Sequence, residues 1–268
     1  MDFGLNEIQR EIRDLCRAIF KDQVTPEKLA SYDEYAMPRF DKELWSSLAE
    51  AGLVSTTIEL DYGGSQLGFM ELALLLEEIG RSIAPVPLAS HSLSMMALQK
   101  FGHEEIRKRI LPDAASGKIL LTSAFLEPKE NNPISARSTW CIFDGENYII
   151  SGQKHAVPFA EQADYILLSA VCEENPIIFI IEPDAAGVSV NSLQVTSFEP
   201  QAEISLNEVT VKPNQVVTTT NASALVKWQF DRMLSLICMH QVGATDTVMR
   251  MSASYTSERV QFGVPIAT

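Results

Sequence analysis

The spacing of apolar residues changes twice along the chain, and this constrains the fold more than any other feature. Up to about residue 118, apolar residues recur every three or four positions, as on one face of a helix. From about 119 to 217 they alternate or form short runs typical of strands, and from 222 to 259 the helical period returns without a proline. The sequence therefore predicts an α+β multidomain fold. The predicted parts are an N-terminal helical domain over residues 1–120, a middle β-barrel or sandwich domain over 121–221 and a helical segment over 222–268.

Local signals place helices in the first part. Asn6 and Gln9 have the spacing of a capping box. The run "DKELWSSLAEAG" predicts a short helix ended by Gly52, and "EEIRKRILPDAASG" predicts another that is broken near Pro112. One helix face is predicted for Leu5, Ile8, Ile12, Leu15 and Ile19.

Turn signals organise the second part. In "CIFDGENYII" the pair Asp144 and Gly145 supplies the positive-φ turn of a hairpin between two apolar arms. In "EISLNEVTV" the apolar alternation slips by one residue, which predicts a bulge near Asn207 and Glu208.

The third part reads as one long helix from about Ala222 to Arg259. A single helix cannot bury its own apolar face, so it needs partners. Because the sequence up to Thr268 shows no further helix, we expect an oligomer packed through this helix.

Composition narrows the function. The net charge of −14, from 21 basic and 35 acidic residues, argues against nucleic-acid binding and against adsorption to anionic membranes. The four cysteines form no CxxC pair and the four histidines are scattered, which argues against a metal site. Neither a signal peptide nor an apolar run of membrane-spanning length is visible, and a reducing, cytoplasmic location is expected.

The order of these parts, together with several short motifs, resembles the flavin-dependent acyl-CoA dehydrogenase family. The motifs are "ELDYGGSQLGFMELALLLEEIGRSIAP", "SAFLEP", "YIISGQKHAV", "AEQADYILLSA" and "ERVQFGVPI". The resemblance covers essentially all 268 residues. It implies that the last part begins a C-terminal helical bundle and that this divergent chain is the front part of a longer one.

The resemblance implies a role for the end of the long helix. Arg259 would contact the pyrophosphate of FAD, which suits a planar, permanently charged guanidinium. Gln261 would donate a further hydrogen bond, and Phe262 would pack near the cofactor in a site shared between subunits. The alternative is an ordinary helix terminus, with Gly263 as its C′ cap.

The strand end at "SAFLEP" is the second implied site. The backbone groups of Phe125 and Leu126 would meet the edge of the isoalloxazine ring. Leu126 replaces the threonine of the family pattern, and residues 129–133, "KENNP", replace its Gly-Ser loop. The alternative is a strand end followed by a polar turn.

The segment after Lys154 is the third. Many family members carry Trp-x-Thr here, and Ala156 and Pro158 occupy those two positions. Pro158 supplies neither a hydroxyl nor a backbone N–H. Val157 and Phe159 would supply apolar packing to the flavin instead, whereas His155 is expected at the surface.

No catalytic residue can be named. The family removes an α-proton with a glutamate, which in most members lies in helices beyond the last residue of this sequence. A minority place it in the long helix, and the family spacing counted back from Arg259 reaches Met233, which cannot act as a base. Asp231 lies about 200° round the helix from that position.

The resemblance implies α,β-dehydrogenation of an acyl-CoA thioester, with FAD as hydride acceptor and an electron-transfer flavoprotein-type acceptor as partner. Two alternatives stay open. One is a non-catalytic partner subunit of a heteromeric acyl-CoA dehydrogenase, and the other is a different flavoenzyme on the same fold, such as an oxidase or monooxygenase. Homo- and hetero-oligomers are both compatible with the sequence.

Overall fold

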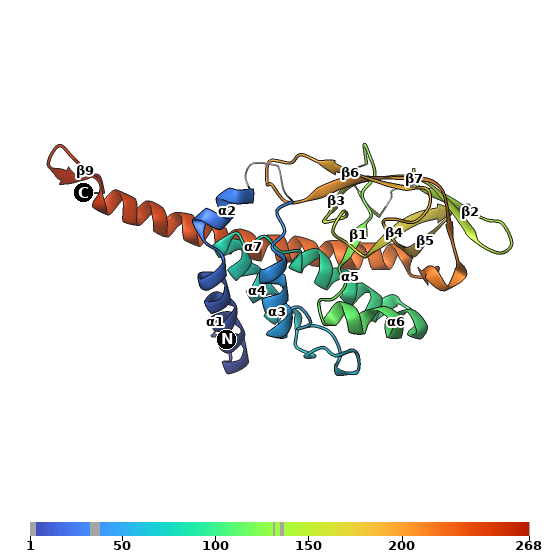
Figure 1. Ribbon diagram of the computed structural model, residues 1–268, viewed down its shortest axis with the longest axis horizontal. Helices are drawn as coiled ribbons and strands as arrows, with labels where there is room; N and C mark the ends of the chain where they lie inside the picture. The colour runs from blue at the N-terminus through green and yellow to red at the C-terminus, as the bar shows by residue number, and fades with distance from the viewer. Residues whose placement is uncertain (1–3, 33–37, 131, 135–136, 268) are drawn as a thin grey trace.

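The computed structural model describes residues 4–32, 38–130, 132–134 and 137–267. The N-terminal helices lie on one side and a mixed sheet on the other, while helix α7 runs along both and extends past them (Figure 1). The helices are α1 (Glu7–Gln23), α2 (Pro26–Tyr32), α3 (Lys42–Glu50), α4 (Phe69–Ser82), α5 (Leu88–Phe101), α6 (Glu104–Ala115) and α7 (Ala222–Glu258), with 3-10 turns at Leu60–Tyr62 and Pro213–Gln215. The strands are β1 (Leu121–Ala124), β2 (Trp140–Phe143), β3 (Tyr148–Pro158), β4 (Tyr165–Cys172), β5 (Asn175–Ile181), β6 (Val188–Leu193), β7 (Gln201–Val211), β8 (Val216–Thr218), β9 (Val260–Gln261) and β10 (Val264–Pro265).

Helix α1 begins as the sequence predicts but buries a narrower face. Asn6 caps it in a capping box with Gln9. Only Ile12, Cys16 and Phe20 are buried, four residues apart, because α1 packs mainly on α4 and α3. Two members of the predicted face, Ile8 and Leu15, are exposed, so that part of the prediction is wrong.

Helix α6 corrects a second prediction, because it continues through Pro112 to Ala115. A proline in the last turn of a helix removes only one intrahelical donor. Burial of Leu111 and Ala114 in the core supports the helix on both sides of it. The turn at Gly117, with φ of 71°, then leads the chain toward β1.

Helix α5 does not follow from the apolar pattern. Small polar side chains at Ser90, Ser92 and Ser94 are buried in it beside apolar ones, so no amphipathic stripe marks the helix. It lies in the interior, against α6, α7 and β1.

The sheet has the order β6-β7-β3-β2-β4-β5-β8, with β1 pairing parallel to β4. The β2–β3 hairpin turns at Asp144 and Gly145, as predicted. Between Gly152 and Ile150 of β3 the register on β7 shifts from Leu206 to Val209. Glu208 has φ of 52° there, which confirms the predicted bulge. The predicted fold class is confirmed, while the exact domain boundaries stay predictions.

The apolar core has two parts. The larger one fills the helical layer and includes residues from β4, β5 and β8, such as Leu167, Ile178 and Val217. The smaller one lies within the sheet, around Ile150, Phe179 and Ile204. The helices therefore cover one face of the β4–β5 region, and the sheet curves around its own core on the other.

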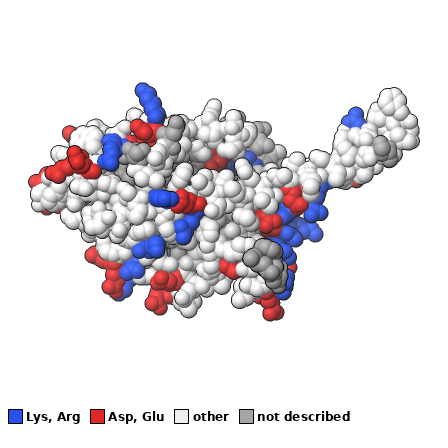
Figure 2. Space-filling model, turned by 180° about the vertical axis from the view of Figure 1, so that it is seen from behind, with Lys and Arg blue, Asp and Glu red and all other residues white. Residues whose placement is uncertain are grey.

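Helix α7 has partners within the chain, which corrects the expectation that it lacks them. It packs on α4 and α5 and touches β5. Its last turns extend beyond the rest of the chain, and Figure 2 shows this end as mostly uncharged. Several apolar side chains remain exposed along that end: Val248, Met249, Met251, Tyr255 and Val260. In the part of the chain that the structure describes, no helix is both long and apolar enough to cross a membrane.

Candidate functional site

A cavity of about 610 Å³ opens between the sheet and helix α7. Its walls come from the end of α4 and the 83–87 segment, the start of α5, the ends of β1 and β3, the 197–200 loop and the middle of α7. This volume lies in the range of pockets that hold small ligands. Three α7 side chains on its wall, Phe230, Leu234 and Ile237, are also 39%, 49% and 46% exposed, so the cavity is open along α7.

Two strand ends predicted from the sequence meet at this cavity. Phe125 and Leu126, just after β1, line it together with Pro158 and Phe159 at the end of β3. The backbone N–H of His155 donates to the Leu126 carbonyl at 3.0 Å, which holds the two strand ends side by side. The sequence therefore brings together four of its predicted site residues.

A bulge in β3 determines which side chains at the end of this strand face the cavity. The register on β7 shifts between Lys154 and Val157, so the strand carries one extra residue, and Ala156 has φ of 51°. Lys154 and Val157, three positions apart, both point into the protein as a result. Ala156 and Pro158 line the cavity, but the Val157 side chain is 1% exposed inside the sheet core and does not. No signal in the sequence marks this bulge.

The segment after the bulge is also held by its backbone. Phe159 has φ of 52°, and its N–H donates to the Pro200 carbonyl at 2.8 Å. The Thr122 hydroxyl donates to the Pro158 carbonyl at 2.6 Å. A positive φ at a non-glycine residue costs on the order of 1–3 kcal/mol and often marks a functional site.

The motif residues Glu127 and Lys154 form a buried ion pair below the strand ends. Their side chains are each 1% exposed, and Nζ lies 2.7 Å from Oε1. Lys154 also donates to Ser169 at 3.1 Å, and Glu127 accepts from the backbone N–H of Thr139 at 3.0 Å. Burial lowers the pKa of Lys154 to about 8, against the opposing effect of the Glu127 carboxylate. The pair therefore serves as a structural clamp between β1 and β3.

The pKa of Glu127 follows from the same contacts. Burial raises it, but the hydrogen bonds from Lys154 and from the backbone of Ser138 outweigh burial, so the pKa of Glu127 lies below its usual range. The carboxylate is therefore charged at neutral pH and matched by the Lys154 ammonium.

The other wall is fixed by a close contact between α4 and α7. A Cβ added at Gly80 would lie 1.9 Å from the His240 carbonyl oxygen, and one added at Gly243 would lie 1.8 Å from the Glu77 carbonyl oxygen. The two helices thus meet backbone to backbone at reciprocal glycines. This places the cavity-lining part of α7 on α4.

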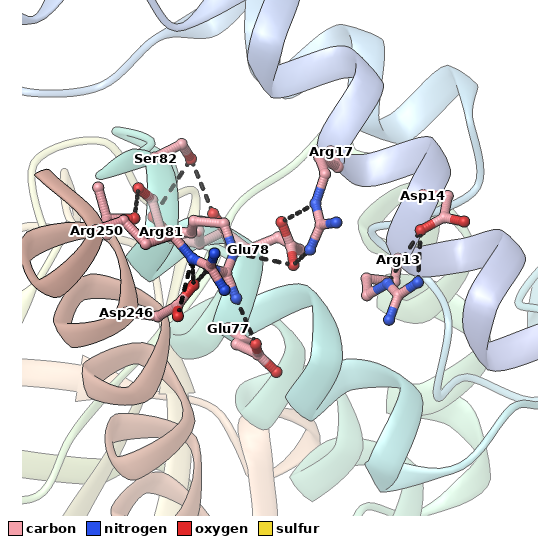
Figure 3. A network of polar contacts seen from close by, with 11 residues as sticks. Arg13, Asp14, Arg17, Glu77, Glu78, Arg81, Ser82, Asp246 and Arg250 are labelled. Carbon is pink, nitrogen blue, oxygen red and sulfur yellow. Dashed lines mark hydrogen bonds and ion pairs between the residues drawn. The ribbon is translucent and has the colours of Figure 1, made fainter. Parts of the chain in front are cut away.

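Charged side chains reinforce this contact, as Figure 3 shows. Arg81 of α4 pairs with Glu77 at 2.6 Å and with Asp246 of α7. The buried Glu78 accepts from Arg81 at 3.3 Å and from Arg17 of α1 at 2.6 Å. The Glu-Glu-x-Gly-Arg motif therefore joins three helices.

Titratable groups at the cavity are few. Burial lowers the pKa of His240, and both His240 and the exposed Glu199 line the cavity. Sequence reasoning missed both, because neither stands in a recognisable motif. Met233 lines the cavity as well, whereas Asp231 is paired with Lys227 at 2.6 Å on the exposed side of α7. The structure thus places a thioether at the cavity position that the family spacing reaches.

The structure describes the polar turn after Glu127 only in part. Pro133 lines the cavity, and Lys129 has φ of 68°. The predicted replacement at Asn131 lies outside the described residues. Among the described residues, no group of three or more His, Cys, Asp or Glu side chains is arranged to hold a metal ion.

Arg259, Gln261 and Phe262 lie away from this cavity, at the far end of α7. Helix α7 ends at Glu258, and Phe262 and Gly263, with φ of 53° and 87°, form the turn of the β9–β10 hairpin. Gly263 is therefore a hairpin residue and not a helix cap. The Arg259 guanidinium lies 5.4 Å from the Tyr255 ring centroid, and Phe262 is fully exposed. Within one chain these residues cannot reach the strand ends.

Comparison with known proteins places this three-part arrangement in a family. The acyl-CoA dehydrogenase N-terminal domain model matches residues 6–118. Acyl-CoA dehydrogenase FadE27 of Mycobacterium tuberculosis is 28% identical over 269 residues, which cover 100% of this chain and 70% of the relative. A probable acyl-CoA dehydrogenase of Bacillus subtilis, YngJ, is 28% identical over 283 residues and is covered to 73%.

Solved structures agree. The ChsE4–ChsE5 complex from Mycobacterium tuberculosis contains a chain with a TM-score of 0.91 and 26% identity, covering 100% of this chain and 71% of that one. A variant of the Tcur3481–Tcur3483 steroid ACAD has a TM-score of 0.88 and 31% identity, covering 98% and 70%. The fold is therefore that of known acyl-CoA dehydrogenase structures. This chain belongs to the acyl-CoA dehydrogenase family.

Proposed function

We propose that this chain is an acyl-CoA dehydrogenase-like flavoprotein that acts on an acyl-CoA thioester. The cavity between the β1 and β3 strand ends and α7 is the observation that carries this proposal. Its walls are largely apolar, as an acyl chain requires, and its polar side chains come from α5, β1 and α7 as well as from His155 and the 197–201 segment.

The residues present fit the ring of FAD in part. Phe125 and Phe159 are aromatic residues that line the cavity at the strand ends. Leu126 and Pro158 offer no side-chain hydrogen bond, so recognition of a ring would rest on packing and backbone groups. When bound, FAD would supply the acceptor for the hydride that leaves Cβ of the acyl group.

The chain's own residues would position the walls of the cavity and enclose the acyl chain. The Glu127–Lys154 pair holds the two strand ends together, and the Gly80–Gly243 contact holds α7 across from them. The apolar side chains of Leu76, Ile79 and Met233 would exclude water from the acyl chain. Because Met233 cannot accept a proton, the base that takes the Cα proton must come from another segment or another chain.

A second chain is part of the proposal. Arg259 and Gln261 lie too far along α7 to serve their own cavity, so we place them at the FAD pyrophosphate of a neighbouring subunit. The exposed apolar side chains at the end of α7 would be covered in such an oligomer. Electrons would leave to an electron-transfer flavoprotein-type acceptor.

A non-catalytic partner subunit is the second candidate function. This alternative is favoured by Met233 at the position that the family spacing reaches, and by the absence of side-chain donors at Leu126 and Pro158. Both solved structures described above are named as pairs of different chains, ChsE4 with ChsE5 and Tcur3481 with Tcur3483. In this alternative the chain would be a structural part of the assembly, and its cavity would not turn over substrate.

An anaerobic titration tests the proposal. The purified protein, alone and combined with a partner acyl-CoA dehydrogenase chain, is mixed with a panel of acyl-CoA thioesters while flavin absorbance is followed. If at least one thioester bleaches the flavin and this bleaching is lost in Phe159→Asp, the reaction depends on this chain's cavity and the enzyme is supported. Bleaching that is unchanged by Phe159→Asp supports the partner-subunit alternative.

A further inference from the structure

The sheet has a short joint in its middle. In the order β6-β7-β3-β2-β4-β5-β8, the β2 and β4 strands connect the two halves. Over the described residues their register comprises Trp140 with Val171 and Cys141 with Cys172. The joint therefore contains a pair of cysteines facing each other across parallel strands.

The geometry of this pair suits a covalent bond. Neighbouring strands lie about 4.8 Å apart, and a disulfide needs Cα atoms about 4.4–6.8 Å apart. Direct register partners point to the same face of a sheet, so the two thiols lie beside each other. Cys141 is buried in the inner core of the sheet, and Cys172 packs against the same core while staying partly exposed.

We propose that Cys141 and Cys172 form a redox modification site, at which a low-molecular-weight disulfide such as oxidised glutathione converts the two thiols into a disulfide. The bond would staple the two halves of the sheet at their short joint. The proposal does not depend on the function proposed above.

The reaction proceeds by two thiol–disulfide exchanges. The partly exposed Cys172 thiolate attacks one sulfur of oxidised glutathione, whose S–S bond breaks and releases one glutathione thiolate. Cys141 then gives its proton to solvent, and its sulfur attacks the Cys172 sulfur, releasing the second glutathione. Two protein thiols are oxidised by two electrons, and one oxidised glutathione is reduced to two thiols.

The difference in burial sets the order of these steps. Burial, and then the neighbouring Cys172, raises the pKa of the Cys141 thiol to about 12. The Cys141 thiol is therefore protonated at neutral pH. Because only a thiolate attacks a disulfide, Cys172 reacts first. Capture of Cys172 as a mixed disulfide also removes its charge from beside Cys141.

The test uses the chain with the exposed Cys238 changed to serine, which leaves Cys16, Cys141 and Cys172. It is incubated with oxidised glutathione, and thiols are counted after unfolding, beside an intact mass. We expect the count to fall from three to one, with a mass lower by about 2 Da that dithiothreitol restores. The thermal midpoint should rise by about 5 °C, since the bond closes a loop of the unfolded chain.

Two variants sharpen the result. In the Cys141→Ala chain, Cys172 should keep a stable glutathione adduct and the thermal midpoint should not rise. In the Cys172→Ala chain, Cys141 should stay a free thiol. A persistent glutathione adduct on the chain that retains both cysteines, or three free thiols after incubation, would overturn the proposal.

Discussion

Two neighbouring regions of the molecule differ in how closely they match the family motifs. One is the contact between α4 and α7, and the other is the cavity that this contact borders. At the contact, Gly80 and Arg81 stand where the family motif places them, and each has a defined geometric task. At the cavity, Leu126 and Pro158 offer no side-chain hydrogen-bond donor at positions where the resemblance implies one. We therefore propose that the scaffold that positions the site is retained, while the groups proposed to face a ligand have changed.

The largest expected effect comes from the buried clamp between the strand ends. A Lys154→Met change leaves the Glu127 carboxylate buried without its counter-charge. We expect the free energy of unfolding to fall by about 3–5 kcal/mol, measured by chemical denaturation.

The matched control is the double change Glu127→Gln with Lys154→Met, which removes both charges. It should recover a large share of the lost stability. A single variant as stable as the parent would show that the pair is not a clamp, and the contrast between scaffold and cavity would weaken.

The next effect concerns pH. His91 is fully buried, its Nε2–H donating to the Ala114 carbonyl and its Nδ1 accepting from the Leu121 N–H. Burial lowers its pKa to about 4 from an ordinary value of 6.5. Between these values the unfolded chain binds the extra proton, so stability falls as pH drops from 6.5 toward 4, by about 3 kcal/mol in full.

A His91→Gln change keeps a donor and an acceptor but does not titrate. Its stability should change less than that of the parent between pH 6.5 and 5, where few carboxylates titrate. Equal slopes of unfolding free energy against pH would remove His91 from the explanation.

A smaller effect is expected at the helix contact. In Gly243→Ala, the added methyl group meets the Glu77 carbonyl, so the helices must separate. Overpacking of this kind costs about 1–3 kcal/mol. Ala253→Val, on the exposed end of α7, is the control and should change unfolding by less than about 0.7 kcal/mol.

The smallest effect tests the cavity. Leu126→Thr restores the hydroxyl of the family pattern beside the proposed ring site. One added hydrogen bond contributes about 0.5–1.5 kcal/mol, so FAD should bind up to about tenfold more tightly in an equilibrium titration. Leu126→Val is the shape-matched control without the hydroxyl. Equal affinity for the two variants would separate Leu126 from the flavin.

Much of the fold could be predicted from the sequence, because local signals and tertiary packing agree. The Asn6 cap, the Asp144–Gly145 turn and the Asn207–Glu208 bulge all appear where the sequence indicates. Helix α5 was not readable, because its buried serines erase the amphipathic pattern. The predicted break of α6 near Pro112 was wrong, because a proline is tolerated when tertiary packing supports the helix on both sides of it.

The candidate site was less predictable. Motifs located the strand ends, but the bulge that turns Ala156 toward the cavity depends on pairing with β7, which no local pattern encodes. Glu199 and His240 reach the cavity from a loop and a helix far apart in sequence. For Arg259, a single chain shows only that it lies far from its own cavity.

We propose that this cavity and a second chain's Arg259 together form one flavin site. Its most direct test is flavin absorbance after desalting of the assembled protein, with Arg259→Ala compared against the parent and against Arg250→Ala on the same helix. We expect Arg259→Ala to lose most of its flavin while the assembly stays intact by light scattering, and Arg250→Ala to keep its flavin. Flavin retention in Arg259→Ala equal to that of the parent would contradict it.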